Sequence, residues 1–156
     1  MTIKAIALDV DGVLTDGSFF WGRGEEETKR FSFRDVMGIS LGSRAGICFA
    51  LISGEPSSLV DRYAAKMGIE DVYKGCKDKA AAFREFAVKR GLPLNEIAFM
   101  GDDVNDIEAM KLSGFACAPA DAHAEVLRLA SFVSCHPGGQ GAVRELIDLL
   151  LSDREK

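Results

Sequence analysis

Three short apolar runs, each followed by a polar loop, constrain the fold of this chain most strongly. They span residues 3–8, 47–52 and 97–100. Runs of this length are typical of strands, and helix-like segments separate them, an alternation that favours a parallel sheet flanked by helices. The sequence therefore predicts an α/β fold. Shorter strands are predicted at residues 72–73, 115–117 and 132–133.

The clearest amphipathic helix spans residues 77–90 and stops at Gly91. Its apolar side chains fall on one face, as in a helix that packs on a sheet. Glycine is a common residue just past such a helix end. A second helix is predicted to close the chain, with an apolar stripe formed by Val143, Leu146, Ile147 and Leu150.

Composition limits the kinds of protein that this chain can be. Its 156 residues, 47% of them hydrophobic, suffice for one domain over residues 1–156. The net charge is -5 and basic residues do not cluster, so nucleic acid is not expected as a partner. No apolar run approaches the roughly 20 residues of a membrane span. The cysteines are widely spaced and no secretory leader precedes the first strand, which predicts a cytoplasmic protein with reduced thiols.

Residues 18–33 break the alternation of strands and helices. Two strand-like segments, 18–21 and 28–33, flank the glycine-rich turn 22–25, as in a β-hairpin. The large aromatic residues of this stretch are Phe19, Phe20, Trp21, Phe31 and Phe33. Because exposed apolar patches usually mark contacts, the hairpin is predicted to protrude as an oligomer interface. The alternative is that it folds onto its own sheet.

Acidic residues follow two of the predicted strands. Asp9 and Asp11 end the first strand, and the turn through Gly12 lets their carboxylates converge. A second acidic group follows residues 97–100 and comprises Asp102, Asp103 and Asp106. The carboxyl ends of parallel strands share one edge of a sheet, and carboxylates gathered there repel one another unless a divalent cation neutralises them. Oxygen ligands of this kind predict a Mg²⁺ site.

Three residues between these acidic groups are suited to binding an anion. Ser53 and Gly54 follow the second strand and offer a hydroxyl and a backbone N–H. Lys79 lies near the start of the helix 77–90 and can hold a phosphate oxygen or neutralise a nucleophile. Each feature alone is common on protein surfaces, so the interpretation depends on their order along the chain.

That order resembles the haloacid dehalogenase superfamily, in which a DxD strand end, a Ser-Gly strand end, a helical lysine and a GDDxxD strand end follow one another. The resemblance implies a three-layer, Rossmann-like fold. It also implies that Asp9 is the nucleophile that takes a phosphoryl group, and that Asp11 is the general acid and base. Ser53 and Lys79 complete the implied catalytic set.

The same resemblance assigns the metal ligands and their neighbours. Mg²⁺ is expected between the Asp9 carboxylate, the Asp11 backbone carbonyl and the Asp102 carboxylate. Asp103 and Asp106 are expected to orient metal-bound water or the catalytic lysine. A general acid at position 11 favours a phosphatase over a dehalogenase.

The space between Asp11 and Ser53 holds only the hairpin and one helix, too little for a separate cap domain. This narrows the resemblance to the small, cap-less, tetrameric phosphatases of 2-keto-3-deoxy sugar acid phosphates. The strings that carry it are DVDGVLTDG, FSFRD, GDDVND and GGQGAVRE. In such enzymes a neighbouring subunit covers the active site. The resemblance therefore predicts a homotetramer that acts on a small sugar acid phosphate.

Two substrate branches compete within that family: 3-deoxy-D-manno-octulosonate (KDO) 8-phosphate and 2-keto-3-deoxynonulosonate (KDN) 9-phosphate. Where the eight-carbon branch typically has an arginine suited to a sugar carboxylate, this chain has Glu55, which cannot replace it. Glu55 with Lys66 resembles the nine-carbon branch, so KDN 9-phosphate is the prediction. KDO 8-phosphate is the alternative, because Arg34-Asp35 and GGQGAVRE are closer to that branch. The predicted substrate-binding residues are Gly12, Gly54, Glu55, Lys66, Arg34 and Asp35.

Other interpretations stay open at this point. Glu55 and Lys66 are alternatively a solvated loop acid and an exposed helical lysine. The chain also resembles the non-catalytic assembly modules of acylneuraminate cytidylyltransferases, and a phosphatase of broad specificity is a third alternative. The glycine-rich stretch 138–141 is compatible with a flexible loop that closes near phosphate.

Overall fold

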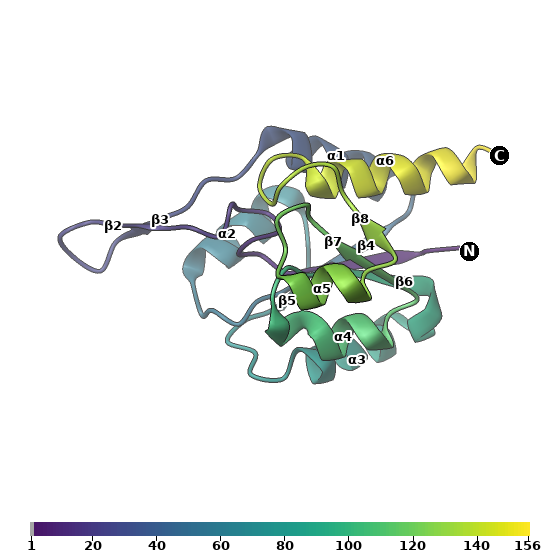
Figure 1. The fold of residues 1–156 in the computed structure, drawn as a ribbon, viewed down its shortest axis with the longest axis horizontal. Coiled ribbons are helices and arrows are strands. Elements are labelled where there is room, and N and C mark those ends of the chain that lie inside the picture. Colours follow the sequence, from purple (N-terminus) through teal and green to yellow (C-terminus); the bar gives the residue numbers. More distant parts are fainter. Residues whose placement is uncertain (1) are drawn as a thin grey trace.

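The computed structural model describes residues 2–156 and shows a six-stranded, fully parallel sheet (Figure 1). The strand order is β5-β4-β1-β6-β7-β8. The strands are β1 (Ala5–Leu8), β4 (Cys48–Ile52), β5 (Asp71–Tyr73), β6 (Ile97–Met100), β7 (Phe115–Ala118) and β8 (Phe132–Val133). Every predicted strand is therefore present, with small shifts at its ends.

Helices cover both faces of the sheet and complete a three-layer α/β fold. One face carries α1 (Phe33–Arg44), α2 (Ser58–Met67) and α6 (Ala142–Arg154). The other carries α3 (Lys79–Arg90), α4 (Ile107–Leu112) and α5 (Ala124–Leu129). Asp78 caps the start of α3, and Gly91 ends it in the left-handed conformation, as predicted.

The central strand β1 shows why a continuous apolar run suits this position. Ile6 and Leu8 belong to the core under α1, α2 and α6, whereas Ala5 and Ala7 belong to the core under α3. Successive side chains of a strand point to opposite faces, so an unbroken apolar run fills both cores at once.

The strand order reverses beside β1, and this reversal positions the candidate site. The chain runs from β1 outward through β4 and β5, then crosses to β6 on the other side of β1. At such a reversal the loops that leave the neighbouring strands diverge and open a crevice at their carboxyl ends. The loops after β1, β4 and β6 begin at Asp9, Ser53 and Gly101, so the predicted motifs meet at this edge.

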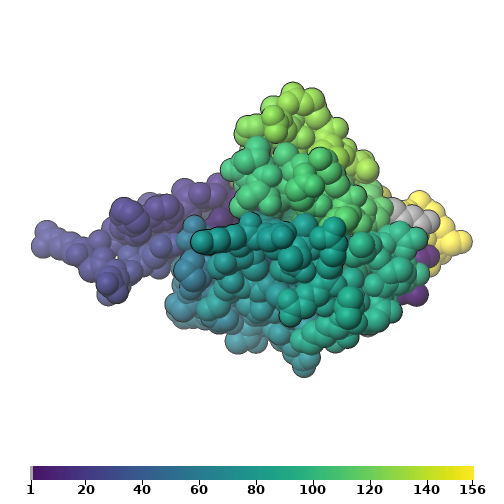
Figure 2. Space-filling view, turned by 90° about the horizontal axis from the view of Figure 1, so that it is seen from below, coloured from purple at the N-terminus to yellow at the C-terminus, as the bar shows by residue number. Residues whose placement is uncertain are grey.

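The predicted hairpin is present as an arm that projects from the body (Figures 1 and 2). It consists of β2 (Phe20–Trp21) and β3 (Glu27–Thr28), which pair antiparallel. It is shorter than predicted, because Phe31 turns back and stacks on Tyr63, with 4.7 Å between the ring centroids. Ser32 then caps α1, and Phe33 is the first residue of that helix. The prediction that Phe31 and Phe33 lie on the ribbon is therefore wrong.

Three aromatic residues remain on the arm. Phe19, Phe20 and Trp21 are 49%, 69% and 74% exposed, so the hairpin does not fold onto its own sheet. Between β1 and β4 the chain forms only this hairpin and α1, and residues 2–156 contain no separate cap domain. No helix in the described chain is long and apolar enough to cross a membrane.

Candidate active site

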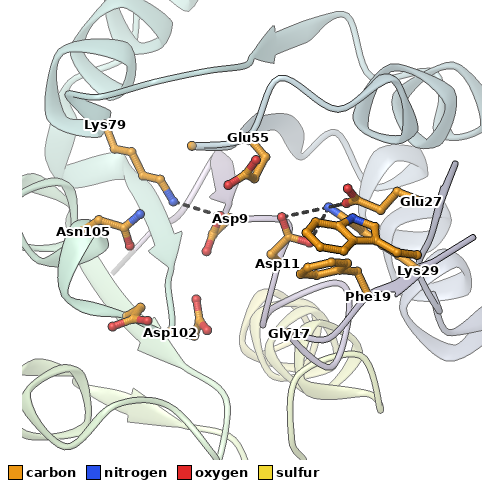
Figure 3. Close-up of a pocket in the computed structure, with 13 residues that line it drawn as sticks. Asp9, Asp11, Gly17, Phe19, Glu27, Lys29, Glu55, Lys79, Asp102 and Asn105 are labelled. Atoms are coloured by element: carbon orange, nitrogen blue, oxygen red, sulfur yellow. Dashed lines mark hydrogen bonds and ion pairs between the residues drawn. The ribbon is translucent and has the colours of Figure 1, made fainter. Parts of the chain in front are cut away.

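A cavity of about 430 Å³ opens at the carboxyl edge of the sheet beside β1 (Figure 3). This volume is typical of small-molecule sites. The carboxylates in its wall belong to Asp9, Asp11, Glu27, Glu55, Asp102 and Asp103. The cationic residues in its wall are Lys29 and Lys79, and the hairpin adds Phe19 and Trp21. The structure thus gathers acids from three strand ends and from the hairpin around two ammonium groups whose side chains are buried.

The tight turn after β1 brings the first and second acidic groups together. The three residues that follow Gly12 all donate their backbone N–H to the carbonyl of Val10. Gly12 itself has φ of 86°, and a Cβ at this position would lie 1.8 Å from Oδ2 of Asp102. Gly12 is therefore required by the close approach of the two acidic loops, since no side chain fits between them.

Lys79, in the first turn of α3, joins two of the carboxylates. Its Nζ lies 2.9 Å from Oδ1 of Asp9 and 2.8 Å from Oδ1 of Asp106, and its side chain is 2% exposed. Burial alone would lower the pKa of Lys79, but the two carboxylates outweigh burial and raise it. The lysine is therefore held as an ammonium against Asp9.

Asp106 is buried and uses both carboxylate oxygens inside the protein. Oδ1 accepts from Lys79, and Oδ2 accepts the backbone N–H groups of Asp102 and Asp103 at 2.9 and 3.2 Å. Asp103 in turn caps the short 3-10 turn η2 (Val104–Asp106). These contacts fit the expectation that Asp106 orients the lysine, and they fix the loop that presents Asp102.

The acidic cluster fits a divalent cation. Oxygen atoms of Asp9, Asp102 and Asp106 lie within 4.8 Å of one another. Burial, then the Asp106 carboxylate, raise the pKa of Asp9 well above its ordinary value, against the lowering effect of Lys79. Burial likewise raises the pKa of Asp102 to about 6. Carboxylates crowded in this way favour a bound cation, and since Asp106 has both oxygens occupied, Asp9 and Asp102 are the side chains that can hold it.

Asp11 lies on the other side of the cavity, beside a lysine for which the motifs predict no role. Lys29 Nζ is 2.9 Å from Oδ1 and 3.1 Å from Oδ2 of Asp11. Asn105, from the η2 turn, also lines the cavity without a predicted role. Its place inside the GDDVND string is a signal that could have identified it, whereas Lys29 approaches Asp11 only because the hairpin folds back.

Comparison with known proteins gives the family. Residues 47–146 match the family of haloacid dehalogenase-like hydrolases. The chain is 40% identical to the 3-deoxy-D-manno-octulosonate 8-phosphate phosphatase of Escherichia coli K12 over 149 residues. This alignment covers 96% of the chain and 79% of the Escherichia coli protein. The chain belongs to the haloacid dehalogenase-like hydrolases.

Solved structures agree with the assignment of this chain to the hydrolases. The chain superposes with a TM-score of 0.96 on the 3-deoxy-D-manno-octulosonate 8-phosphate phosphatase of Yersinia pestis, at 37% identity over 99% of this chain and 83% of that chain. The Moraxella catarrhalis phosphatase of the same name, in complex with magnesium, phosphate and KDO, has a TM-score of 0.93 at 35% identity, over 96% of this chain and 86% of that chain. The hydrolase is thus a phosphatase, which disfavours a non-catalytic assembly module.

The predicted anion-binding residues of the hydrolase lie at the end of β4. Ser53 is buried, and its Oγ accepts the backbone N–H of Glu55 at 3.1 Å. Gly54 lines the cavity, where a Cβ would meet only ordinary contacts, the nearest with Asn105 at 3.7 Å. The Glu55 side chain also lines the cavity (Figure 3).

Arg34 and Asp35 are not brought to the cavity within one chain. Asp35 is buried, and its Oδ1 accepts the backbone N–H of Arg144, at the start of α6, at 3.1 Å. Burial raises the pKa of Asp35, although the N–H groups of this helix start lower it in part. Arg34 lines a separate pocket beside His136. The reason is that the first turn of α1 packs against the start of α6, so Asp35 joins these two helices instead of lining the cavity.

Lys66 is also separated from Glu55. It lies in the last turn of α2, with Nζ 5.8 Å from the ring centroid of Phe33, in an apolar pocket beside Tyr63. Glu55 precedes the Ser57 cap at the opposite end of this helix, and eight residues of helix span roughly 12 Å. The predicted Glu55–Lys66 pair therefore does not form within one chain.

The glycine-rich stretch near the C-terminus packs against the turn that follows β1. Gly138 and Gly139 are buried, and the N–H of Gly139 donates to the carbonyl of Val13 at 2.9 Å. The N–H of Gly138 donates to Oδ1 of Asp121 at 3.0 Å. A Cβ at Gly138 would lie 1.8 Å from the carbonyl oxygen of Gly12. The stretch is thus packed under the turn and is not a free loop over the phosphate site.

Magnesium is expected to stabilise the hydrolase strongly at about pH 7.5 and weakly at about pH 5. In the metal-free protein the pKa of Asp102, about 6, lies above its ordinary value of 3.8, so this group makes the fold less stable as pH rises through that interval. Above pH 6 Mg²⁺ no longer competes with a proton for the Asp102 carboxylate. Bound Mg²⁺ should therefore offset the loss of stability that the ionised carboxylate causes. Thermal unfolding with and without Mg²⁺ at both pH values measures this. Metal at about 100 times its Kd should add about 2.7 kcal/mol at the higher pH.

Asp102→Asn is the matched variant, and it should lose the magnesium effect at both pH values. An equal rise in Tm at both pH values in the wild type would contradict the assignment of Asp102 as a ligand.

Proposed function

We propose that this hydrolase removes the phosphate group from KDO 8-phosphate. The observation that carries the proposal is its 40% identity, over 96% of the chain, with the Escherichia coli enzyme that acts on this ester. The Moraxella catarrhalis relative binds magnesium, phosphate and KDO, and the last two are the products that hydrolysis of the ester yields. The comparisons thus favour the eight-carbon alternative over the nine-carbon substrate that Glu55 indicated.

In the proposed mechanism Asp9 is the nucleophile. Its Oδ1 is fixed by the N–H of Val10 at 2.8 Å and by Lys79 at 2.9 Å, which leaves Oδ2 to attack phosphorus. A bond forms between this oxygen and phosphorus while the bond from phosphorus to the sugar oxygen breaks, and the departing oxygen takes a proton from Asp11.

Water completes the proposed cycle. It attacks the phosphorus of the aspartyl phosphate and gives a proton to the Asp11 carboxylate, while the bond between Asp9 and phosphorus breaks and phosphate leaves. Lys79 keeps its proton throughout and holds Asp9 in place. The carboxylates of Asp9 and Asp102 and the backbone carbonyl of Asp11 would hold Mg²⁺, which would supply positive charge against the phosphate oxygens.

The assembly of the enzyme is part of the same proposal. Phe19, Phe20 and Trp21 give the hairpin arm an exposed apolar surface. Exposed apolar patches of this kind usually mark contacts with another protein. We assign this arm to a homotetramer in which a neighbouring subunit covers the cavity. The single domain over residues 1–156, the cytoplasmic location and the roles of Arg34, Asp35 and Lys66 at such an interface stay predictions.

Substrate preference tests the proposed function. The kcat/KM of the wild type for KDO 8-phosphate should exceed that for KDN 9-phosphate at least about tenfold, a difference of about 1.4 kcal/mol. Glu55→Arg should lower the KM for KDO 8-phosphate several-fold, because it replaces a carboxylate in the cavity wall by a cation that can grip the sugar carboxylate.

Glu108→Arg, on the exposed side of α4, makes the same change of charge outside the cavity. It should leave the KM and the kcat/KM for KDO 8-phosphate unchanged. A tenfold preference for the nine-carbon ester would restore KDN 9-phosphate as the substrate, and similar rates on many sugar phosphates would indicate a phosphatase of broad specificity.

A further inference from the structure

Lys29 is an unusually buried lysine at the base of the hairpin. It follows β3 directly, and only 3% of its side chain is exposed, whereas the Asp11 side chain is 30% exposed. Its Nζ contacts both oxygens of Asp11, at 2.9 and 3.1 Å, and Oε1 of Glu27 at 3.2 Å. Figure 3 shows Lys29 and Glu27 on the hairpin side of Asp11, across the cavity from Lys79.

Stability alone explains this arrangement poorly. Burying an ammonium is costly, and pairing it with carboxylates often does no more than offset that cost. Burial lowers the pKa of Lys29, but Asp11 and Glu27 outweigh it and raise the pKa, so the lysine remains charged. A buried cation that holds a half-exposed acid in a cavity wall fixes the direction of that acid.

Lys79 cannot take over this task. Its ammonium is already bonded to Asp9 and Asp106 on the opposite side of the cavity. Besides Lys79, Lys29 is the one cationic residue that lines the cavity in the described chain. The orientation of the Asp11 carboxylate therefore depends on a residue that the hairpin carries.

We propose that Lys29 is the positioning residue for Asp11: it holds the carboxyl group where proton exchange with the leaving oxygen and with water takes place, and it couples that exchange to the hairpin. This rests on the proposed function, in which Asp11 is the acid and base. Lys29 itself keeps its proton, since the proton that the sugar oxygen receives comes from Asp11.

The proposal predicts a dependence on the leaving group. The alkoxide of a sugar needs a proton when the ester bond breaks, whereas p-nitrophenolate leaves without one. Loss of Lys29 should therefore slow phosphoryl transfer from a sugar phosphate and spare the first phosphoryl transfer from p-nitrophenyl phosphate. A residue that only binds phosphate, or only supports the fold, would affect both.

The test compares Lys29→Met and Lys29→Arg with Lys111→Met, which removes an exposed lysine of α4 that pairs with Glu108. On KDO 8-phosphate, Lys29→Met should reduce kcat about 100-fold with KM changed less than about twofold, and Lys29→Arg should recover most of the rate. In rapid-mixing experiments the first release of p-nitrophenolate should stay within about threefold of the wild type. Lys111→Met should behave as the wild type.

A higher KM with unchanged kcat, an equally slowed release of p-nitrophenolate, or an unchanged rate on the sugar ester would overturn the proposal. If Lys29→Met does not fold, Lys29→Gln, which keeps a hydrogen-bond donor without the charge, is measured in the same way. A wild type that prefers KDN 9-phosphate would contradict the proposed substrate only, and the same variants measured on that ester would still test Lys29.

Discussion

Replacing Asp9 by asparagine is expected to reduce the rate of phosphate release at least about 1000-fold, because the variant has no carboxylate to form the bond to phosphorus. The fold should persist. Asparagine can still accept from Lys79 at Oδ1, and Lys79 keeps its second partner, Asp106. Burial and the Asp106 carboxylate raise the pKa of Asp9, whereas Lys79 lowers it. Loss of the charge therefore relieves repulsion and weakens the pair with Lys79 at the same time, and the metal-free variant should unfold within a few degrees of the wild-type Tm.

Asp61→Asn provides the control for Asp9→Asn, since it removes an exposed carboxylate of α2 that pairs only with Lys74 in the described chain. It should retain full activity. Turnover by Asp9→Asn close to that of the wild type would remove Asp9 from the mechanism, while a large drop in its Tm would show that the residue is needed for folding and not specifically for chemistry.

Gly138→Ala is expected to be among the most destabilising single substitutions away from the acidic cluster. The new methyl group would lie 1.8 Å from the carbonyl oxygen of Gly12 and 3.0 Å from that of Thr15. Both are backbone atoms in a buried turn and cannot move aside as a flexible side chain does. We expect a loss of about 3 kcal/mol in the free energy of unfolding, or roughly 10 °C in Tm.

Activity should fall together with stability in Gly138→Ala, because the displaced turn carries Asp9 and Asp11. Gly24→Ala is the matched control: its Cβ would meet nothing within 4 Å, and this glycine lies in the exposed hairpin turn. Denaturant unfolding of both variants measures the difference. If Gly138→Ala were as stable and active as Gly24→Ala, the stretch 138–141 would not support the catalytic turn.

The sheet and the acidic half of the site could be predicted because their signals are local. An apolar run followed by acids marks both β1 and β6, and parallel pairing of these strands brings Asp9 and Asp102 to one edge. The Asp78 cap before α3 places Lys79 in the first turn of that helix. Each step needs only a short window of sequence and the rule that strand ends share an edge.

The other half of the site could not be predicted in this way. Lys29 meets Asp11 across 18 residues, through a hairpin whose return path is set by the packing of Phe31 on Tyr63. No local pattern encodes that path. The spacing between Glu55 and Lys66 is compatible with a pair, but the length of α2 separates them. A single exposed loop residue was also weak support for a choice between two sugar acids.

The most direct test of the account is to trap the phosphorylated enzyme. Asp11→Asn lacks the base for the water step, yet p-nitrophenyl phosphate needs no acid for the first step, so this variant should accumulate the intermediate. It should release about one equivalent of p-nitrophenolate per active site in a burst, and mass spectrometry after acid quench should locate one phosphoryl group on Asp9. Absence of the burst, or a phosphoryl group on any other residue, would contradict the account.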